Sequence, residues 1–202
     1  MLLWPDPEVC TKHRLCMSEE LEVLKIVTGR LNKASIPYMV SGSIAANYYT
    51  VPRMTRDIDI VIELKQDDID KFVSLFEDGF YVNREMVTNE VSRMGIFNLI
   101  HNRYVIKIDF IIKKPSAHQK AAFSHKKEIL IEGSPMWFIS AEDLVISKLI
   151  WAKDSHSEMQ LKDVRNLIKT VDNLDLKYIY NWVRELGLEQ IYKEARDERH
   201  AS

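Results

Sequence analysis

Hydrophobic and polar residues follow two different periods along the chain. Between residues 18 and 33, four aliphatic residues recur at helical spacing, and Ser18 followed by glutamates is typical of a helix start. Residues 57–63 and 104–112 instead alternate from one residue to the next, which is the period of a strand. Helix and strand patterns succeed one another up to residue 139, and the patterns after it are all helical.

These patterns predict an α/β (α+β) fold, with a small mixed sheet and its flanking helices over residues 1–139 and a helical C-terminal region over residues 140–202 that closes a cleft. Residues 1–16 contain prolines without a period and predict an N-terminal arm. The predicted helices cover residues 18–33, 44–49, 67–78, 140–153, 159–170, 175–186 and 188–198. The predicted strands cover residues 38–40, 57–63, 96–100, 104–112, 129–131 and 136–139, with a turn at 133–135 and no clear period at 81–94.

Composition narrows the class of protein. The chain has 202 residues, of which 46% are hydrophobic and 29% charged, which is typical of a soluble globular domain and excludes a collagen or a disordered chain. Its beginning does not resemble a signal peptide, and two cysteines are too few for a disulfide framework. We therefore expect a cytoplasmic protein without a membrane span. The net charge of −2 excludes a strongly basic coat for nucleic acid but allows a local basic patch.

Three acids stand where strands rarely carry them. Asp57 and Asp59 open one predicted strand, Asp109 lies inside another, and all three are on the face opposite the isoleucines. If these strands are neighbours, the three carboxylates lie close together and repel one another, and a divalent cation would relieve this repulsion. Mg²⁺ and Mn²⁺ are the ions that such oxygen ligands suit. The alternatives are a turn residue at Asp57, a solvent-facing Asp59, and a surface ion pair of Asp109 with Lys107 or Arg103.

A second feature lies upstream of these acids. Gly42 and Ser43 stand between a predicted strand and a predicted helix. Glycine allows a ligand to approach the backbone closely, and a helix N-terminus offers N–H groups to an anion such as phosphate. Phosphate beside a carboxylate-bound metal is the arrangement for phosphoryl or nucleotidyl transfer. A simple Gly-Ser turn before a short helix remains the alternative.

The combination of these features resembles the DNA polymerase beta-like nucleotidyltransferase superfamily. Its pattern is a hydrophobic strand, Gly-Ser, a gap, and then Asp-x-Asp among apolar residues, here Tyr38–Ser43 followed by Arg53–Ile60, with the third acid in Lys107-Ile108-Asp109-Phe110. Segments Ser140–Leu144, Lys148-Leu149 and Lys162-Asp163 are similar to the bacterial abortive-infection-type toxin branch. That branch often has a second acid after Asp163, where this chain has Asn166.

The resemblance implies a role for each matched residue. Gly42 and Ser43 would hold the triphosphate, and Asp57 and Asp59 would bind two Mg²⁺ ions about 4 Å apart. Asp109 would be a third ligand or would help to activate the acceptor hydroxyl. The remaining residues that we expect at the nucleotide are Lys148, which would neutralise phosphate charge, Asp163, which would support it, and Arg53.

The resemblance implies an enzyme that transfers a nucleoside monophosphate from a nucleoside triphosphate. In the toxin branch the acceptor would be an RNA end such as tRNA, with a cognate antitoxin as partner. Residues 113–127 hold five lysines and no acid, and they are a candidate surface for such an acceptor. Alternatives are transfer to a protein or to a small molecule such as an aminoglycoside, and a non-catalytic member that only binds nucleotide.

Overall fold

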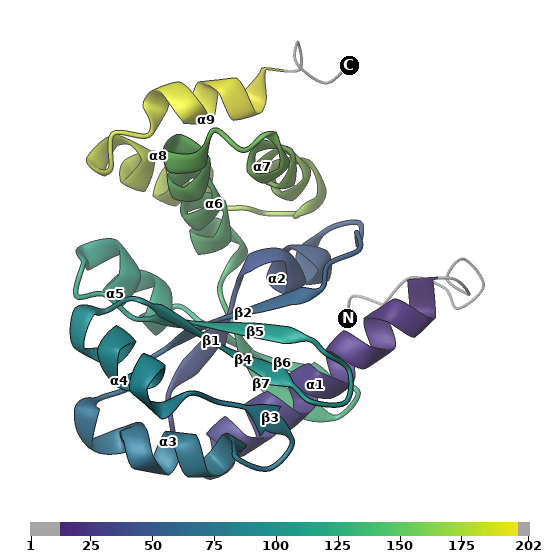
Figure 1. Cartoon of the computed structure of the whole chain (residues 1–202). Coiled ribbons are helices and arrows are strands. Elements are labelled where there is room, and N and C mark those ends of the chain that lie inside the picture. The colour runs from purple at the N-terminus through teal and green to yellow at the C-terminus, as the bar shows by residue number, and fades with distance from the viewer. Residues whose placement is uncertain (1–12, 198–202) are drawn as a thin grey trace. The chain divides into compact units, whose positions relative to one another are not determined.

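The computed structural model describes residues 13–197, with side chains from residue 19 onward, and Figure 1 labels its elements. The helices are α1 (His13–Lys33), α2 (Gly42–Tyr49), η2 (Gln66–Asp68), α3 (Ile69–Phe76), α4 (Arg84–Arg93), α5 (Ala117–Ser124), α6 (Ala141–Ser155), α7 (Glu158–Thr170), α8 (Leu176–Glu185) and α9 (Glu189–Arg196). The strands are β1 (Tyr38–Val40), β2 (Asp57–Ile62), β3 (Phe80–Tyr81), β4 (Ile96–His101), β5 (Lys107–Ile112), β6 (Lys127–Ile131) and β7 (Ser134–Phe138). No helix in the described range is both long enough and apolar enough to span a membrane.

The strands of the described chain form one mixed sheet. Its order is β3-β4-β5-β2-β1-β7-β6, so strands that are distant in sequence become neighbours. Strand β2 runs parallel to β5, and β1 runs parallel to β7, whereas β4 is antiparallel to both β3 and β5. The predicted α/β class with a mixed sheet and flanking helices is therefore confirmed.

The chain divides into two compact units that draw on interleaved segments. The first unit contains the residues up to Tyr38, Met54–Ile112 and Leu130–Met136. The second contains Met39–Arg53, Lys113–Ile129 and the residues from Trp137 onward. Helices α2 and α5 are thus grouped with the C-terminal helices α6 to α9.

Aromatic packing fixes the apolar face of the sheet in the first unit. The ring of Phe72 on α3 lies 5.4 Å from that of Phe97 on β4 and 5.2 Å from that of Phe110 on β5. Ile58 and Ile60 of β2 are fully buried. Because side chains alternate along a strand, this packing leaves Asp59 and Asp109 on the opposite face. Burying the apolar residues therefore decides which way the acids point.

Helix α6 is the central helix of the second unit and contacts α2, α7, α8 and α9. Leu144, Val145 and Leu149 are fully buried along it. The helix begins after Ser140, whose hydroxyl accepts a hydrogen bond from the backbone N–H of Asp143 at 3.1 Å. The predicted start of this helix is confirmed.

The carboxylate of Asp143 ties the start of α6 to two other helices. It accepts hydrogen bonds from the hydroxyl of Ser140 at 2.6 Å and from the hydroxyl of Tyr178 on α8 at 2.7 Å, and Nε2 of His118 on α5 lies 3.6 Å away. Burial alone would raise the pKa of Asp143, but the interactions with His118, Ser140 and Tyr178 outweigh it and lower this pKa below its usual value. Asp143 is therefore ionised at neutral pH.

Several sequence-based boundaries need correction. Helix α1 begins at His13, so Ser18 lies inside this helix and is not its N-cap. Residues 81–94, for which no clear period was found, contain α4. The lysine-rich residues 113–127 contain α5. Residues 104–106 lie outside β5, and the turn before β7 is made by Glu132 and Gly133, both with positive φ. Helices α4 and α5 were missed because polar residues interrupt their short apolar stripes. Residues 1–12 of the predicted arm lie outside the described range.

Replacing Ser140 by alanine should destabilise the protein more than the same change at the N-cap of α5. Ser116 also accepts a bond from the first turn of its helix, at 3.3 Å, but Ser140 is buried and additionally donates to Asp143. We expect Ser140→Ala to cost about 2 kcal/mol and Ser116→Ala about 1 kcal/mol or less, as measured by urea denaturation followed by circular dichroism. Equal costs would show that the bond to Asp143 adds nothing.

Candidate functional site

The three candidate acids of the first unit lie on one face of two neighbouring strands. Strands β2 and β5 pair in parallel, with Asp59 opposite Asp109 and Asp57 opposite Lys107. The carboxylate of Asp57 is exposed, and those of Asp59 and Asp109 are half-buried. The adjacency on which convergence of the carboxylates depended is therefore present.

Lys107 is the counter-charge within this acidic face. Its ammonium lies 2.8 Å from Oδ2 of Asp109 and 3.8 Å from Oδ1 of Asp57. The hydrogen bond to Asp109, together with the charges of all three acids, outweighs partial burial and raises the pKa of Lys107 above its usual value. The ion pair of Asp109 with Lys107, which the sequence offered as an alternative to a metal site, is thus formed.

Asn98 on β4 extends the polar row to a third strand, and the sequence did not single it out. It stands opposite Asp109 in the antiparallel pairing of β4 with β5, so the row across the sheet reads Asn98, Asp109, Asp59. Asn98 could have been found from the predicted hairpin of these two strands. Once the length of the link between them is known, the pairing places Asn98 on the same face as Asp109. Its amide offers both a donor and an acceptor at this face.

The donor chemistry of this face fits Mg²⁺ or Mn²⁺, which prefer carboxylate and amide oxygens. Within residues 13–197, no three His, Cys, Asp or Glu side chains are grouped closely enough to hold a metal by themselves. Mg²⁺ in nucleotide enzymes is usually held by one or two carboxylates together with substrate phosphates, not by a cage made only of protein. The face therefore offers part of a coordination shell that phosphate oxygens could complete.

The second unit holds the other candidate residues around the start of α2. Gly42 has a φ of 61°, a left-handed conformation that strains any residue with a side chain. The N-cap residue of this described helix, Ser41, makes no side-chain capping bond. The backbone N–H groups of the first helical turn have no partner within the helix, and the helix dipole makes this end attractive to an anion.

Arg53 joins the start of α2 to helix α7. Its Nη2 donates to Oγ of Ser43 at 2.8 Å and to Oδ2 of Asp163 at 3.0 Å, and its Nε donates to Oδ1 of Asp163 at 3.2 Å. Asn47 holds the backbone of Arg53 through two hydrogen bonds, one to the carbonyl at 2.7 Å and one from the N–H at 3.0 Å. The guanidinium is thereby fixed in a bidentate pair with a carboxylate.

Lys148 completes this network from helix α6. Only 3% of its side chain is exposed, and Nζ donates to Oδ2 of Asp163 at 2.7 Å and to Oε1 of Gln160 at 3.0 Å. Burial would raise the pKa of Asp163, but the hydrogen bonds from Arg53 and Lys148 outweigh it and lower this pKa. The structure thus joins Ser43, Arg53, Lys148 and Asp163 in one network.

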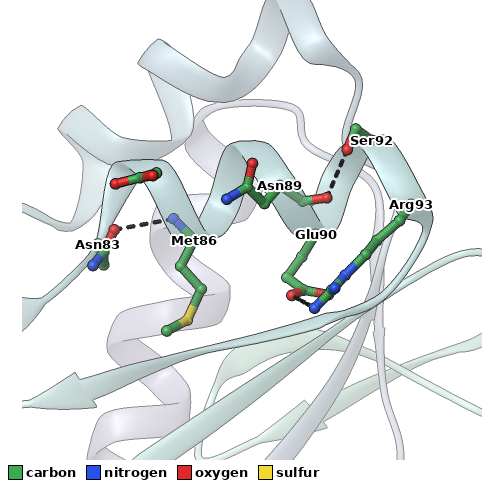
Figure 2. A pocket seen from close by; sticks show the side chains of 7 residues that line it. Asn83, Met86, Asn89, Glu90, Ser92 and Arg93 are labelled. Carbon is green, nitrogen blue, oxygen red and sulfur yellow. Dashed lines mark hydrogen bonds and ion pairs between the residues drawn. The ribbon is translucent and has the colours of Figure 1, made fainter.

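A separate hollow lies along α4 in the first unit, and Figure 2 shows it from close by. Glu90 lines it, with its carboxylate paired to Arg93 and accepting a hydrogen bond from the backbone N–H of Ile96 at 3.2 Å. These contacts join the end of α4 to the start of β4. None of the candidate residues lines this hollow.

No protein-family model matches the sequence, and no curated protein matches it either. Solved structures do match the fold. The antibiotic-resistance factor ANT(2'')-Ia aligns over 89% of this chain and 99% of its own, with 12% identity and a TM-score of 0.54. A nucleotidyltransferase-like antigenic protein from Paracoccidioides brasiliensis aligns over 86% and 90%, with 15% identity and a TM-score of 0.52.

A putative nucleotidyltransferase from Thermotoga maritima aligns over 70% of this chain and 90% of its own, with 18% identity and a TM-score of 0.50. At these identities the likeness concerns the arrangement of helices and strands. The chain therefore has a nucleotidyltransferase fold, as the resemblance of its motifs predicted.

Proposed function

We propose that this protein is a metal-dependent nucleotidyltransferase that moves a nucleoside monophosphate from a nucleoside triphosphate to an acceptor hydroxyl. The observation that carries the proposal is the parallel pairing of β2 with β5, which sets Asp59 beside Asp109 and keeps Asp57 on the same face. This arrangement occurs in a chain whose fold resembles nucleotidyltransferases.

In this proposal Asp57, Asp59 and Asp109 hold divalent cations against the triphosphate. Bound Mg²⁺ would neutralise charge on the attacking and leaving oxygens. The acceptor oxygen forms a bond to the α-phosphorus while the bond from that phosphorus to the bridging oxygen breaks, and pyrophosphate leaves. Asp109 is the candidate group to receive the proton of the acceptor hydroxyl. It stands opposite Asp59, and its side chain is more buried than that of Asp57, the other acid near Asp59.

The second unit supplies groups suited to the triphosphate. The start of α2 at Gly42 and Ser43 offers backbone N–H groups, and Arg53 and Lys148 add two cations. Asp163 holds both cations through 3.0 Å and 2.7 Å contacts, so they are positioned before the nucleotide binds. Such pre-organised charge lowers the cost of stabilising a polyanion in the transition state.

The acceptor that we propose is RNA, with a tRNA end as the first candidate. Residues 113–127 carry five lysines without an acid, whereas the whole chain is slightly acidic. The ammonium groups of Lys113 and Lys126 lie 4.7 Å and 4.0 Å from the centre of the Phe123 ring, and that of Lys126 lies 5.4 Å from that of Trp137. A surface with several lysines and no acid suits the phosphodiesters of RNA.

Charge also separates RNA from the small-molecule alternative. One structural relative was solved with adenylyl-2"-tobramycin, an aminoglycoside product. Aminoglycosides are polycations, and a surface with five lysines and no acid repels them. If the protein acts as the toxin branch that its motifs resemble, addition of a nucleotide to a tRNA end would inhibit growth, and a cognate antitoxin would be its partner.

Removing the acids of β2 should abolish the transfer of labelled nucleotide. We would incubate the protein with each of four α-labelled nucleoside triphosphates, Mg²⁺, and either total tRNA or total protein as acceptor. The Asp57→Asn/Asp59→Asn variant should lose at least about 100-fold in rate, because the developing charge loses its cations. Asp70→Asn, which removes an acid from the exposed face of α3, should leave the rate unchanged.

The acceptor that carries the label decides between the alternatives. Label in tRNA that disappears in the double variant supports the RNA reading, whereas label in protein keeps the chemistry and changes the acceptor. Absence of label and of pyrophosphate release from the folded protein, while it still binds nucleotide, would contradict catalysis and favour a non-catalytic nucleotide binder.

Replacing Asp163 alone should cost more stability than replacing Asp163 and Lys148 together. Asp163→Asn leaves the buried ammonium of Lys148 without its carboxylate and should cost about 3–5 kcal/mol, as measured by urea denaturation. Lys148→Met/Asp163→Leu should cost less, because it leaves only the partly exposed guanidinium of Arg53 without that carboxylate. The same double variant should bind nucleoside triphosphate at least about tenfold more weakly, because a cation is lost. Normal nucleotide affinity would remove Lys148 from the site.

The effect of Asp163 on stability should also depend on pH. Its pKa is lower in the folded state than in the unfolded chain, so its contribution is full above an unfolded pKa of about 3.9 and is lost as the pH falls through the lower folded value. The difference in unfolding free energy between the wild type and Asp163→Asn should therefore shrink below about pH 4. A difference that does not change with pH would contradict an ionised Asp163.

A further inference from the structure

Strand geometry places Lys107 among the acids of the sheet. It stands two residues before Asp109 on β5, so both side chains are on the same face, and the parallel register sets it opposite Asp57. Its Nζ reaches both carboxylates, at 2.8 Å and 3.8 Å. The face therefore combines three carboxylates with one ammonium that lies beside two of them.

This ammonium uses the oxygens that a divalent cation would need. Oδ2 of Asp109 is hydrogen-bonded to Lys107, and Oδ1 of Asp57 is directed at the same ammonium. A metal ion within a few ångströms of Nζ would be repelled by the positive charge of the ammonium. The ammonium and the metal ion would also compete for the same carboxylates. The side chain of Lys107 is 41% exposed, so it has room to move aside toward solvent.

We propose that Lys107 sets the metal affinity of this face: its ammonium substitutes for a divalent cation between Asp57 and Asp109 and must leave before such a cation can bind tightly. The protein then holds Mg²⁺ or Mn²⁺ weakly by itself and tightly only when phosphate oxygens add further ligands and negative charge. Lys107 thereby links tight binding of the metal to binding of the nucleotide. This inference rests on the proposed function, because it takes Asp57 and Asp109 as metal ligands.

Calorimetric titration of Mn²⁺ without nucleotide tests the competition directly. The variants are Lys107→Met, which removes the charge at similar side-chain length, and Lys107→Arg, which keeps it. Lys33→Met, at the exposed end of α1, is the matched loss of one positive charge elsewhere in the first unit. We expect Lys107→Met to bind Mn²⁺ roughly tenfold more tightly than the wild type, and the other two variants to bind as the wild type does.

Thermal unfolding gives a second readout that does not depend on activity. Without metal, Lys107→Met should unfold at a lower temperature than the wild type, because three carboxylates then repel one another without a counter-charge. Saturating Mn²⁺ should raise its unfolding temperature more than that of the wild type, since a ligand stabilises the state that binds it more tightly. Adding Asp109→Asn to Lys107→Met should reduce this gain.

The outcomes separate this inference from the function on which it rests. Equal or weaker Mn²⁺ affinity in Lys107→Met, with binding measurable in both proteins, would overturn the role of Lys107 and leave the metal site intact. If neither protein binds Mn²⁺, with or without nucleoside triphosphate, both the metal site and this inference are wrong. Tighter binding in Lys33→Met as well would show a general charge effect and would also overturn the role of Lys107.

Discussion

The parallel pairing of β2 with β5 is the interaction on which the candidate site depends. It joins residues about fifty positions apart in sequence and sets Asp59 opposite Asp109. A shift of one residue in this register would turn one of the two acids into the apolar face. Packing of Phe72 against Phe97 and Phe110, and burial of Ile58 and Ile60, make that shift costly. The apolar core thus specifies the position of the carboxylates.

Each of the two units has its own group of interacting charged side chains, and the net charge of each group suits a ligand of opposite charge. In the first unit, one lysine is set against three acids, which leaves a negative face suited to a cation. In the second unit, Asp163 is shared by Arg53 and Lys148, which leaves a positive group beside the start of α2.

The sequence was sufficient to predict the strands that carry the candidate acids but not which strands pair with one another. The two-residue period predicted Asp59 and Asp109 as polar positions on strands. The structure keeps this alternation because the isoleucines of the other face are buried. Adjacency of β2 and β5 is a long-range pairing that no local pattern encodes. Asn98 was not predicted for the same reason, because only its pairing opposite Asp109 on the neighbouring strand places it at the candidate site.

Local patterns do not show the surroundings of a residue when these come from distant segments. Lys148 has fully buried neighbours, Val145 and Leu149, but the carboxylate that pairs with it, Asp163, lies on the next helix. Helix α5 was missed because three polar residues, His118, Gln119 and Lys120, precede the apolar pair that packs inward, Ala122 and Phe123. In contrast, the start of α6 was predictable, since Ser140 and Asp143 interact within one helical turn.

We propose that the face formed by β2 and β5 binds a metal ion together with a nucleoside triphosphate. A crystal structure with Mn²⁺ and a triphosphate analogue that cannot be cleaved between its α- and β-phosphates would test this, with anomalous scattering to locate the ion. We expect Mn²⁺ in contact with the carboxylates of Asp57, Asp59 or Asp109 and with phosphate oxygens, and we expect the anomalous signal to disappear in Asp59→Asn. An analogue bound without an ion, or an ion bound away from these three acids, would contradict it.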